Sequence, residues 1–542
     1  MTPLPPASPT PNTLNSRQIS RAVLIVLLGF LGSGVLGLVR TMLFGVTFGA
    51  SAELDAYYAA QRLPELLYTL VAGGALGSSF IPVFARFLTK GDEAGAWRLA
   101  SAVLTLAMAA AGVLALVLAL LAPWFVPNVL VLGVSPEQAA LTTQMTQIML
   151  VTVVIFTASG LLMGILNAHQ LFLLPSLALI GNNLGQILGG LVAFAAISLF
   201  EIPPAHAIYA LAAGAVLGSL LHLGIQLPGL RKVGARLAAR FDTRTAGARE
   251  VLLLMLPRVF GLAMVQINFT VNVILTSMMI EGSLSALNVA WMLMFFALGV
   301  IAQSVGTAVF PTLSALAAAN DMPVFRQRLA GAMRGVLFLA FPATVVMVVL
   351  GETAVRALFE HGNWTPENTA AAAWALTFFA LGIAAHSLLE VLSRAFYALA
   401  DTWTPVSIGV LSILANIVLS VLLMRVMGDP DSLARGPFAG LALANSLTTI
   451  AEALVLWLLL RRRIGGGNDA TVVRGGVAAL AAALGMGVVM LLVRTGLEGQ
   501  SPWLALFAAL AAGGVTFFGL ALLLGIEEAR TVPGMVLRRV RR

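Results

Sequence analysis

Long apolar runs are the feature that most limits what this chain can become. Runs of about 20 or more residues recur from residue 19 almost to the end, and a helix of that length crosses roughly 30 Å of hydrocarbon. The strict apolar/polar alternation of a membrane β-barrel strand is missing. Because 59% of the residues are hydrophobic and only 10% are charged, a water-soluble surface cannot be assembled. The sequence therefore predicts an all-α integral membrane protein.

The runs predict about fourteen transmembrane helices, with both chain ends in the cytoplasm. Of the 31 lysines and arginines, 24 fall in segments that are intracellular in this topology and only four fall outside. Cations concentrate in cytoplasmic loops, so topology explains the net charge of +8 without a nucleic-acid partner. Residues 1–18, rich in Pro, Ser and Thr, are predicted to form a disordered cytoplasmic tail, and no cleavable signal peptide is evident. The predicted helices span residues 19–48, 54–86, 96–125, 138–167, 172–200, 205–228, 250–280, 284–318, 329–350, 367–398, 404–426, 436–460, 472–494 and 503–526.

The chain repeats itself with an offset of about 230 residues. Aligning residues 74–92 with 304–321 superposes a glycine, a proline and an aspartate, and a second alignment superposes another proline. These pairs are Gly77 and Gly306, Pro82 and Pro311, Asp92 and Asp321, and Pro175 and Pro405. We therefore predict two pseudo-symmetric six-helix lobes followed by two extra helices. Lobe pairs of this kind usually hold a substrate between them and expose it to each side in turn.

The predicted domain boundaries follow from this repeat. The first lobe covers residues 19–230 and the second covers residues 250–463, while residues 464–542 contain the last two helices and a basic C-terminal tail. Residues 231–249 form a cytoplasmic linker with six cations. Two interpretations of this linker stay open, since its charge either fixes the topology or contacts lipid headgroups.

Three arginines, Arg40, Arg62 and Arg258, fall inside predicted membrane helices. A cation at the bilayer centre costs at least about 2.5–3.5 kcal/mol, so it normally faces a cavity or a partner. Arg62 has two candidate partners on nearly the same helix face, Asp55 and Glu65. We predict either a cationic site for an anionic ligand or internal pairs that only neutralise the arginine. Arg258 either faces the cavity or snorkels to the cytoplasmic interface.

Other intramembrane polar residues admit a structural role as well as a functional one. His386, Glu390 and Arg394 follow one another at four-residue intervals. This stripe either carries a proton or an ion, or is satisfied locally. Intramembrane asparagines such as Asn183 are expected to form hydrogen bonds between helices. Pro64 is predicted to kink its helix and to free a backbone carbonyl.

Several motifs of enzyme chemistry are missing. The chain has no cysteine, neither of its two lysines lies in a P-loop, and HExxH and GxSxG do not occur. We therefore expect a protein that is not an enzyme and that carries no catalytic residue, metal site or cofactor.

Residues 33–84 carry short motifs in a fixed order, and these resemble the first two helices of the MurJ/MviN family of lipid II flippases. That family belongs to the MOP (MATE-like) exporter superfamily. QLPGLRKVG at residues 226–234 resembles the family's end of helix 6, and chain length and helix number extend the resemblance to the whole chain. The matching motifs are Ser33, Gly37, Arg40, Phe48-Gly49-Ala50, Asp55-Ala56-Tyr57, Arg62-Leu63-Pro64, Gly74-Ala75 and Phe80-Ile81-Pro82.

The resemblance implies a cation-lined cavity that binds the pyrophosphate of an undecaprenyl-linked peptidoglycan precursor in a bacterial cytoplasmic membrane. It implies alternating access driven by Na⁺, H⁺ or the membrane potential, with cell-wall synthesis enzymes as possible partners. Arginine suits such a ligand because its fork pairs with two phosphate oxygens at once. The residues expected to line the cavity are Arg40, Arg62, Asp55, Ser33 and Arg258.

The chain also departs from the family pattern at positions where the family carries charge. Gly34 stands in place of the first cavity arginine, Thr41 in place of an aspartate, Tyr68 in place of a basic residue, and Trp291-Met292 in place of an Asp-Arg pair. Two alternatives to a flippase of lipid II or a related glycan lipid therefore stay open. One is an ion-coupled exporter of small amphiphiles, and the other is a non-transporting scaffold that recruits envelope enzymes.

Overall fold

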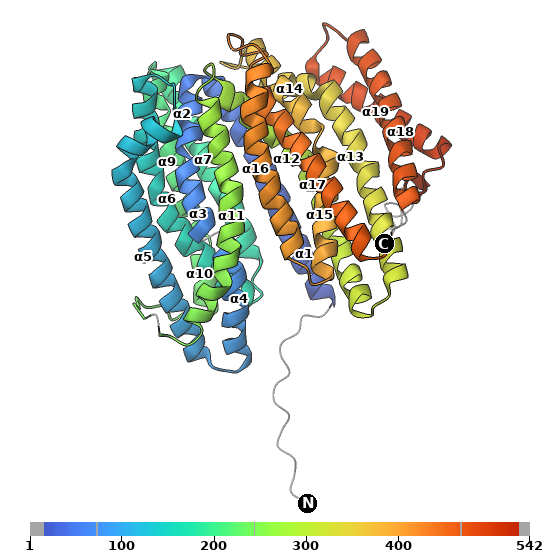
Figure 1. Cartoon of the computed structure of the whole chain (residues 1–542). Coiled ribbons are helices and arrows are strands. Elements are labelled where there is room, and N and C mark those ends of the chain that lie inside the picture. Colours follow the sequence, from blue (N-terminus) through green and yellow to red (C-terminus); the bar gives the residue numbers. More distant parts are fainter. Residues whose placement is uncertain (1–15, 72–73, 243, 467–468, 531–542) are drawn as a thin grey trace, which may run out of the picture. The chain divides into compact units, whose positions relative to one another are not determined.

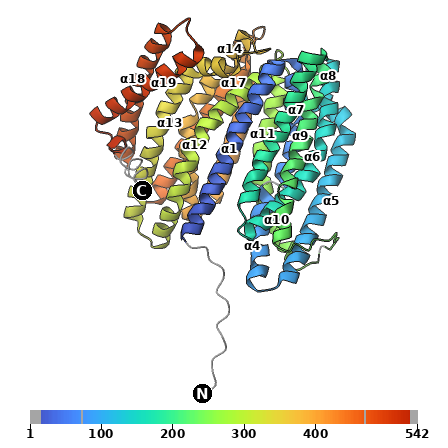
Figure 2. The same ribbon diagram turned by 180° about the vertical axis from the view of Figure 1, so that it is seen from behind.

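The computed structural model describes residues 16–71, 74–242, 244–466 and 469–530, and every regular element in these ranges is a helix (Figures 1 and 2). Within these residues, ten helices are long and apolar enough to cross a membrane, or eleven if α14 (Pro366–Ala380) and α15 (Ile383–Ala398), bent by 42°, form one span. Most of the predicted N-terminal tail lies outside the described residues, and its last residues, from Ser16, already belong to α1. The predicted class, a multi-pass helical membrane protein, is confirmed.

The chain divides into two compact units. Unit 1 takes its residues from Met1–Thr47 and Ala56–Phe269, and unit 2 from Phe48–Asp55 and Thr270–Arg542. The boundary near Phe269 falls inside α11 (Ala248–Thr276), later than the linker at residues 231–249 that the sequence repeat suggested. The other helices of unit 1 are α1 (Ser16–Phe48), α2 (Ala52–Ala60), α3 (Arg62–Val71), α4 (Gly74–Thr89), α5 (Glu93–Phe125) with its π-helical extension η1 (Val126–Leu130), α6 (Pro136–Ala168), α7 (Leu173–Phe200), α8 (Pro204–Ala207), α9 (Tyr209–Gly224) and α10 (Leu227–Lys232).

In unit 1, α7 and α9 lie side by side (Figures 1 and 2) and meet through glycines. Gly185 and Gly189 on α7 face Gly214 and Gly218 on α9, each pair spaced by four residues. A Cβ atom added at Gly185 would lie 2.3 Å from the Cα atom of Gly218. Small residues at this spacing let two membrane helices approach backbone to backbone. This crossing, which we call the glycine seam, fixes α7 against α9.

The basic linker is attached to α5 along part of its length. The backbone N–H of Ala238 donates to Ser101 Oγ at 3.1 Å, and that of Arg240 donates to Thr105 Oγ1 at 2.9 Å. Ser101 and Thr105 are one helical turn apart, so their hydroxyls accept hydrogen bonds from backbone N–H groups that are two residues apart in the linker. The linker is therefore held by unit 1.

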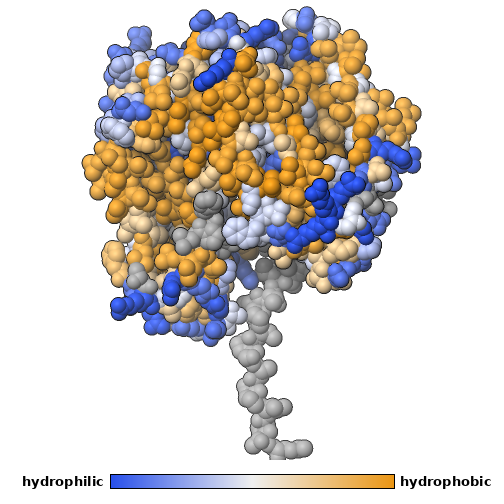
Figure 3. Space-filling view, viewed as in Figure 1, coloured by the Kyte–Doolittle hydropathy of each residue, from blue (hydrophilic) through white to orange (hydrophobic). Residues whose placement is uncertain are grey.

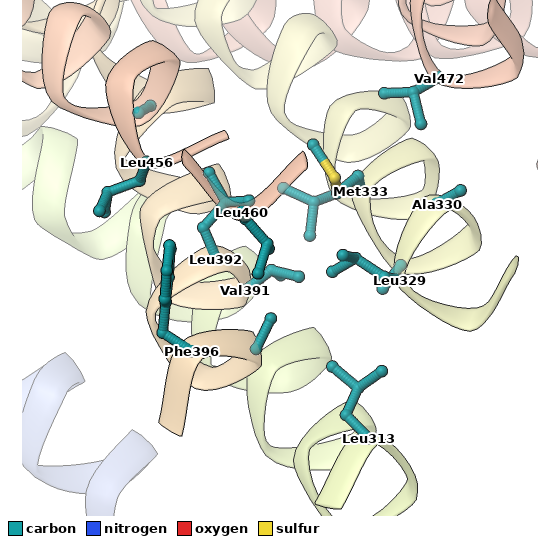
Figure 4. Close-up of a cluster of buried hydrophobic side chains, with 14 of the residues drawn as sticks. Leu313, Leu329, Ala330, Met333, Val391, Leu392, Phe396, Leu456, Leu460 and Val472 are labelled. Carbon is teal, nitrogen blue, oxygen red and sulfur yellow. The ribbon is translucent and has the colours of Figure 1, made fainter. Parts of the chain in front are cut away.

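Among its described residues, unit 2 has the bent pair α14–α15 and six further long helices. Its buried cluster in Figure 4 joins α12, α13, α15 and α17, with Val472 from α18 at its edge. On the face shown in Figure 3, hydrophobic side chains cover wide stretches of the surface and hydrophilic ones gather at helix ends, as a lipid-facing surface requires. The six helices are α12 (Ser283–Ala318), α13 (Met322–Phe359), α16 (Trp403–Val426), α17 (Phe438–Arg463), α18 (Asp469–Gly496) and α19 (Pro502–Leu523).

The local geometry repeats at the offset found in the sequence. Asp92 caps α5 with φ −89° and ψ 69°, and Asp321 caps α13 with φ −87° and ψ 74°. Each aspartate side chain accepts a hydrogen bond from the backbone N–H three residues later. Gln170 and Ala400, 230 residues apart, both adopt positive φ at the turn before α7 and α16. Turn and cap conformations thus recur between the two halves of the chain.

Candidate functional site

Arg40 lies on α1 and is held by two neutral amides of α7. Its Nη1 atom donates to Asn183 Oδ1 at 3.3 Å and to Gln186 Oε1 at 3.2 Å. Within the described part of unit 1, Arg40 has no ion-pair partner. Amide oxygens orient a guanidinium but carry no net charge, so the positive charge of Arg40 is not neutralised.

Ser33 lies two turns before Arg40 on the same helix face and contacts the same asparagine. Asn183 Nδ2 donates to Ser33 Oγ at 2.9 Å and to the Ser33 carbonyl at 3.2 Å. The Ser33 hydroxyl in turn donates to the Leu179 carbonyl at 3.4 Å. Gly37 lies between Ser33 and Arg40 on α1, and a Cβ atom added there would lie 3.6 Å from Asn183 Oδ1. The expected interhelical role of Asn183 is confirmed, and Ser33 anchors it.

Gln186 extends these contacts to α2. The hydroxyl of Tyr57 donates to Gln186 Oε1 at 3.4 Å, and Gln61 Nε2 donates to the Tyr57 oxygen at 2.7 Å. Gln186 Nε2 donates to Asn182 Oδ1 at 3.3 Å. Tyr57 is fully buried, with the ring of Phe44 edge-on at 5.5 Å. We call the set that joins α1, α2 and α7 the Arg40 network: Ser33, Arg40, Tyr57, Gln61, Asn182, Asn183 and Gln186.

Arg62 has the internal partner that the sequence allowed. Its Nη1 atom lies 3.2 Å from Glu65 Oε2, and its guanidinium carbon lies 5.6 Å from the ring centre of Phe269. The Arg62 side chain is 14% exposed, whereas that of Glu65 is 46% exposed. Because one member of the pair remains accessible, the interaction is weaker than a buried ion pair. Arg62 is therefore partly neutralised, unlike Arg40.

The predicted kink before Pro64 is present as a break between α2 and α3 at Gln61. Proline has no N–H to donate to the carbonyl four residues earlier, that of Ala60. The hydroxyl of Thr146, on α6, lies 3.5 Å from this carbonyl while also donating to the Thr142 carbonyl at 2.8 Å. The freed carbonyl thus finds a partner on a neighbouring helix.

Asp55 is bound by the N-terminus of α12, within unit 2. Its Oδ2 atom accepts from the Gly282 N–H at 2.8 Å, and its Oδ1 atom accepts from the Ser285 N–H at 2.7 Å and the Ser285 hydroxyl at 2.6 Å. Carboxylates at this position satisfy free N–H groups and interact favourably with the helix dipole. The carboxylate of Asp55 is therefore engaged as a cap for α12, a role that the sequence did not indicate.

The stripe on α15 is satisfied locally at its C-terminal end. Arg394 and Glu390 form an ion pair. His386 Nε2 lies 3.1 Å from Asn445 Oδ1 on α17. A carboxylate that was not predicted from the sequence, Glu452 on α17, is hydrogen bonded to Ser412 on α16. Arg258 lies in α11, and its side chain lies outside the described residues.

Aromatic side chains occupy two positions where the family pattern has charge. Tyr68 packs on Phe156 with ring centres 4.9 Å apart. Trp291 contacts Phe379 edge-on, with ring centres 5.3 Å apart. At Gly34 an added Cβ atom would meet nothing within 4 Å. In unit 1, Tyr68 and Gly34 therefore stand where the resemblance to the family led us to expect basic residues.

Comparison with known proteins identifies the family. The profile described as "Lipid II flippase MurJ" matches residues 44–510. The lipid II flippase MurJ of Burkholderia cenocepacia is 30% identical over 452 residues, covering 82% of this chain and 84% of the relative. The probable lipid II flippase MurJ of Bdellovibrio bacteriovorus is 29% identical over 528 residues, covering 94% of this chain and 96% of the relative.

Solved structures agree on the fold. A lipid II flippase MurJ in an inward closed conformation superposes with a TM-score of 0.75 at 22% identity, covering 92% of this chain and 98% of that one. An inward-facing multidrug MATE transporter of the MOP superfamily has a TM-score of 0.62 at 14% identity, covering 82% of this chain and 98% of that one. The resemblance seen in the motifs of residues 33–84 is thus confirmed, and the chain belongs to the lipid II flippase MurJ family, whose members are transporters and not enzymes.

Proposed function

We propose that this protein translocates lipid II, or a closely related polyprenyl-pyrophosphate-linked precursor, across the bacterial cytoplasmic membrane by alternating access. Family membership supports the substrate class. The observation that carries the proposal is Arg40, a cation within an apolar helix that no acid neutralises in the described part of unit 1. Such a charge is tolerated where it serves an anionic ligand.

The way Arg40 is held suits a pyrophosphate. Asn183 and Gln186 both use its Nη1 atom. Its Nη2 and Nε atoms form the opposite edge of the fork, which can pair with two phosphate oxygens. Arg62 supplies a second cation, which becomes fully available once Glu65 turns away. Arg258 and Ser33 remain proposed members of the cavity, whereas Asp55 would act through the position of α12.

We infer the fourteen-span topology with both ends in the cytoplasm. Beyond the eleven spans given by length and composition, shorter apolar helices lie within α4, α11 and α12. Counting α2–α4 as one span, with α11 and α12 as two more, gives the expected fourteen. The proposed lobes then cover residues 19–230 and 250–463, and the positive-inside distribution of charge supports their orientation.

The test is transport of fluorescent lipid II in proteoliposomes, with and without an imposed membrane potential. Hydrogen bonds to a charged group contribute about 1.5–3 kcal/mol, so Arg40→Ala should slow transport roughly 10- to 150-fold. Arg40→Lys should recover part of the rate. The control is Arg98→Ala, which removes an exposed cation of α5. Transport by Arg40→Ala at the rate of the control would refute the cavity assignment.

One observation favours a second function. Tyr68 and Trp291 are aromatic residues at positions where the family pattern has charge, and aromatic side chains suit contact with the apolar part of a small amphiphile. MATE transporters share the fold. An exporter of this kind would use the His386 and Glu390 stripe, or Glu452, for ion coupling. Cation-driven efflux of a dye, with no movement of lipid II, would support it. Movement of neither, with capture of cell-wall enzymes, would instead indicate a scaffold.

A further inference from the structure

The basic linker between α10 and α11 has one side packed on unit 1 and another side exposed. Ala235 and Leu237 pack against a buried cluster to which α5 contributes, whereas Arg236 between them is exposed. Arg240 is exposed as well, and the next residue, Phe241, retains 76% of its accessible surface. Cations beside an exposed aromatic side chain are typical of segments that lie at a membrane surface. We call Lys232, Arg236, Arg240 and Phe241 the linker surface.

The positive charge of the linker is not neutralised nearby. Residues 231–249 hold six cations and one acid, Asp242. Asp242 accepts hydrogen bonds from the Arg244 N–H and from the Thr245 hydroxyl, both at 2.9 Å, so its own turn engages it. Among the described residues, none of the six cations forms an ion pair, and the neighbouring Glu250 pairs with Arg86 instead. The exposed side of the linker is therefore a surface suited to anions.

The attachment to α5 sets the level of the linker in the bilayer. Thr105 accepts the hydrogen bond from the Arg240 N–H, and the large apolar side chains exposed on α5 run from Val113 to Trp124. At about 1.5 Å per residue, the helix rises about 29 Å from Thr105 to Trp124, close to the roughly 30 Å of a hydrocarbon core. Trp124 is 63% exposed, as expected of an aromatic side chain at the opposite interface.

Arg240 and Phe241 therefore lie at the level where the headgroups of one leaflet begin. In the proposed topology this is the cytoplasmic leaflet. Figures 1 and 2 both show the linker beside the end of α5 that adjoins α4.

We propose that the linker surface binds the anionic headgroups of the phospholipid bilayer beside unit 1. Lys232, Arg236 and Arg240 contact headgroup phosphates, and the ring of Phe241 enters the boundary between headgroups and acyl chains. The negative surface potential of the leaflet attracts each cation, and an arginine fork pairs with two phosphate oxygens. Because the surface is open, it responds to the density of anionic headgroups and not to one particular acyl chain.

The proposal is independent of what the protein transports. It also goes further than the interpretation in which the linker charge only fixes the topology. Charge alone would fix the topology, whereas an exposed phenylalanine at headgroup level has a purpose only if the linker contacts the bilayer.

The experiment uses the full chain with one reporter, because the sequence has no cysteine. Ala239→Cys, an exposed position beside Arg240, carries a fluorophore. The protein is reconstituted in dioleoylphosphatidylcholine with or without an equal part of dioleoylphosphatidylglycerol. Bromine on the acyl chains of one lipid or the other quenches the fluorophore at close range. Paired quenching curves therefore give the preference of this site for phosphatidylglycerol.

Two variants separate charge from insertion, and both carry the reporter. The charge variant replaces the three cations of the linker surface by glutamine. Its matched control removes three exposed cations of unit 2 by the substitutions Arg328→Gln, Arg462→Gln and Arg474→Gln. The insertion variant is Phe241→Ser, which leaves the charge unchanged.

The wild type and the control should prefer phosphatidylglycerol, and the charge variant should lose up to about fivefold of that preference per cation removed. Phe241→Ser should weaken quenching by both lipids but keep the preference, because the ring holds the segment in the interface. Equal losses in the charge variant and its control would overturn the proposal in favour of diffuse surface charge. A fluorophore that neither lipid quenches would place the linker in water, and would indicate an acidic protein partner instead.

Discussion

Replacing Asn183 by alanine tests whether the amides of α7 act by positioning Arg40. The variant removes the contact from Arg40 Nη1 to Asn183 Oδ1 at 3.3 Å but leaves the contact to Gln186 at 3.2 Å. A hydrogen bond to a charged group contributes about 1.5–3 kcal/mol, and a contact of this length belongs near the lower end of that range. With roughly 1.4 kcal/mol per factor of ten, transport should slow about tenfold.

The assay is a double-mutant cycle in the lipid II proteoliposome assay. If Asn183 acts through Arg40, adding Asn183→Ala to Arg40→Ala should slow transport by less than about twofold, because coupled residues are non-additive. The matched control is Gln147→Ala, which removes an amide of α6 bonded to the Ala119 carbonyl at 2.9 Å, away from the network. A full tenfold loss in both backgrounds would refute the positioning role and indicate a general packing defect.

Three further predictions concern stability in detergent. Gly185→Ala forces a Cβ atom into the α9 backbone and should destabilise unit 1 by about 1–3 kcal/mol. The control is Gly224→Ala, whose added Cβ atom would meet nothing within 4 Å and should leave stability unchanged. Equal melting temperatures of the two variants would contradict the glycine seam. Asp55→Ala removes a helix cap and should lower the free energy of unfolding by about 1–2 kcal/mol, and Asp55→Asn should lower it by less. If Asp55→Asn lost transport at unchanged stability, Asp55 would have a direct role in transport and not only a role as a cap. Hydrogen bonds from Thr404, with Arg463 nearby, lower the pKa of Asp401, so its stabilisation is present above about pH 4 and lost as the pH falls through the lowered value. The melting temperature of Asp401→Asn should therefore lie below that of the wild type at pH 7 and approach it in acid, and a constant difference would contradict this.

The sequence singles out Arg40 but not the side chains that hold it. An arginine inside an apolar run is visible at once, because the cost of its burial demands an explanation. Asn183 and Gln186, however, lie 143 and 146 residues away along the chain. No pattern within one helix can identify such contacts. Tyr57 and Gln61 were missed because they follow no charge pattern of their own.

Asp55 shows what a local argument misses. Its spacing to Arg62 and Glu65 suggests partners only within one stretch of helix. The backbone N–H groups that bind its carboxylate belong to Gly282 and Ser285, 227 and 230 residues later in the chain. The sequence repeat aligned Asp92 with Asp321, and the structure shows that both cap a helix.

The glycine seam sets how closely α7 approaches α9. A single carbon added at Gly185 would lie 2.3 Å from the Gly218 Cα atom, so only a residue without a side chain can stand at the closest point of the crossing. Gly181, Gly185 and Gly189 recur about one turn apart on α7, so the seam fixes the distance between the two helix axes and not a single register. Asn183 and Gln186 belong to the same helix, so the two amides that hold Arg40 keep that distance from α9.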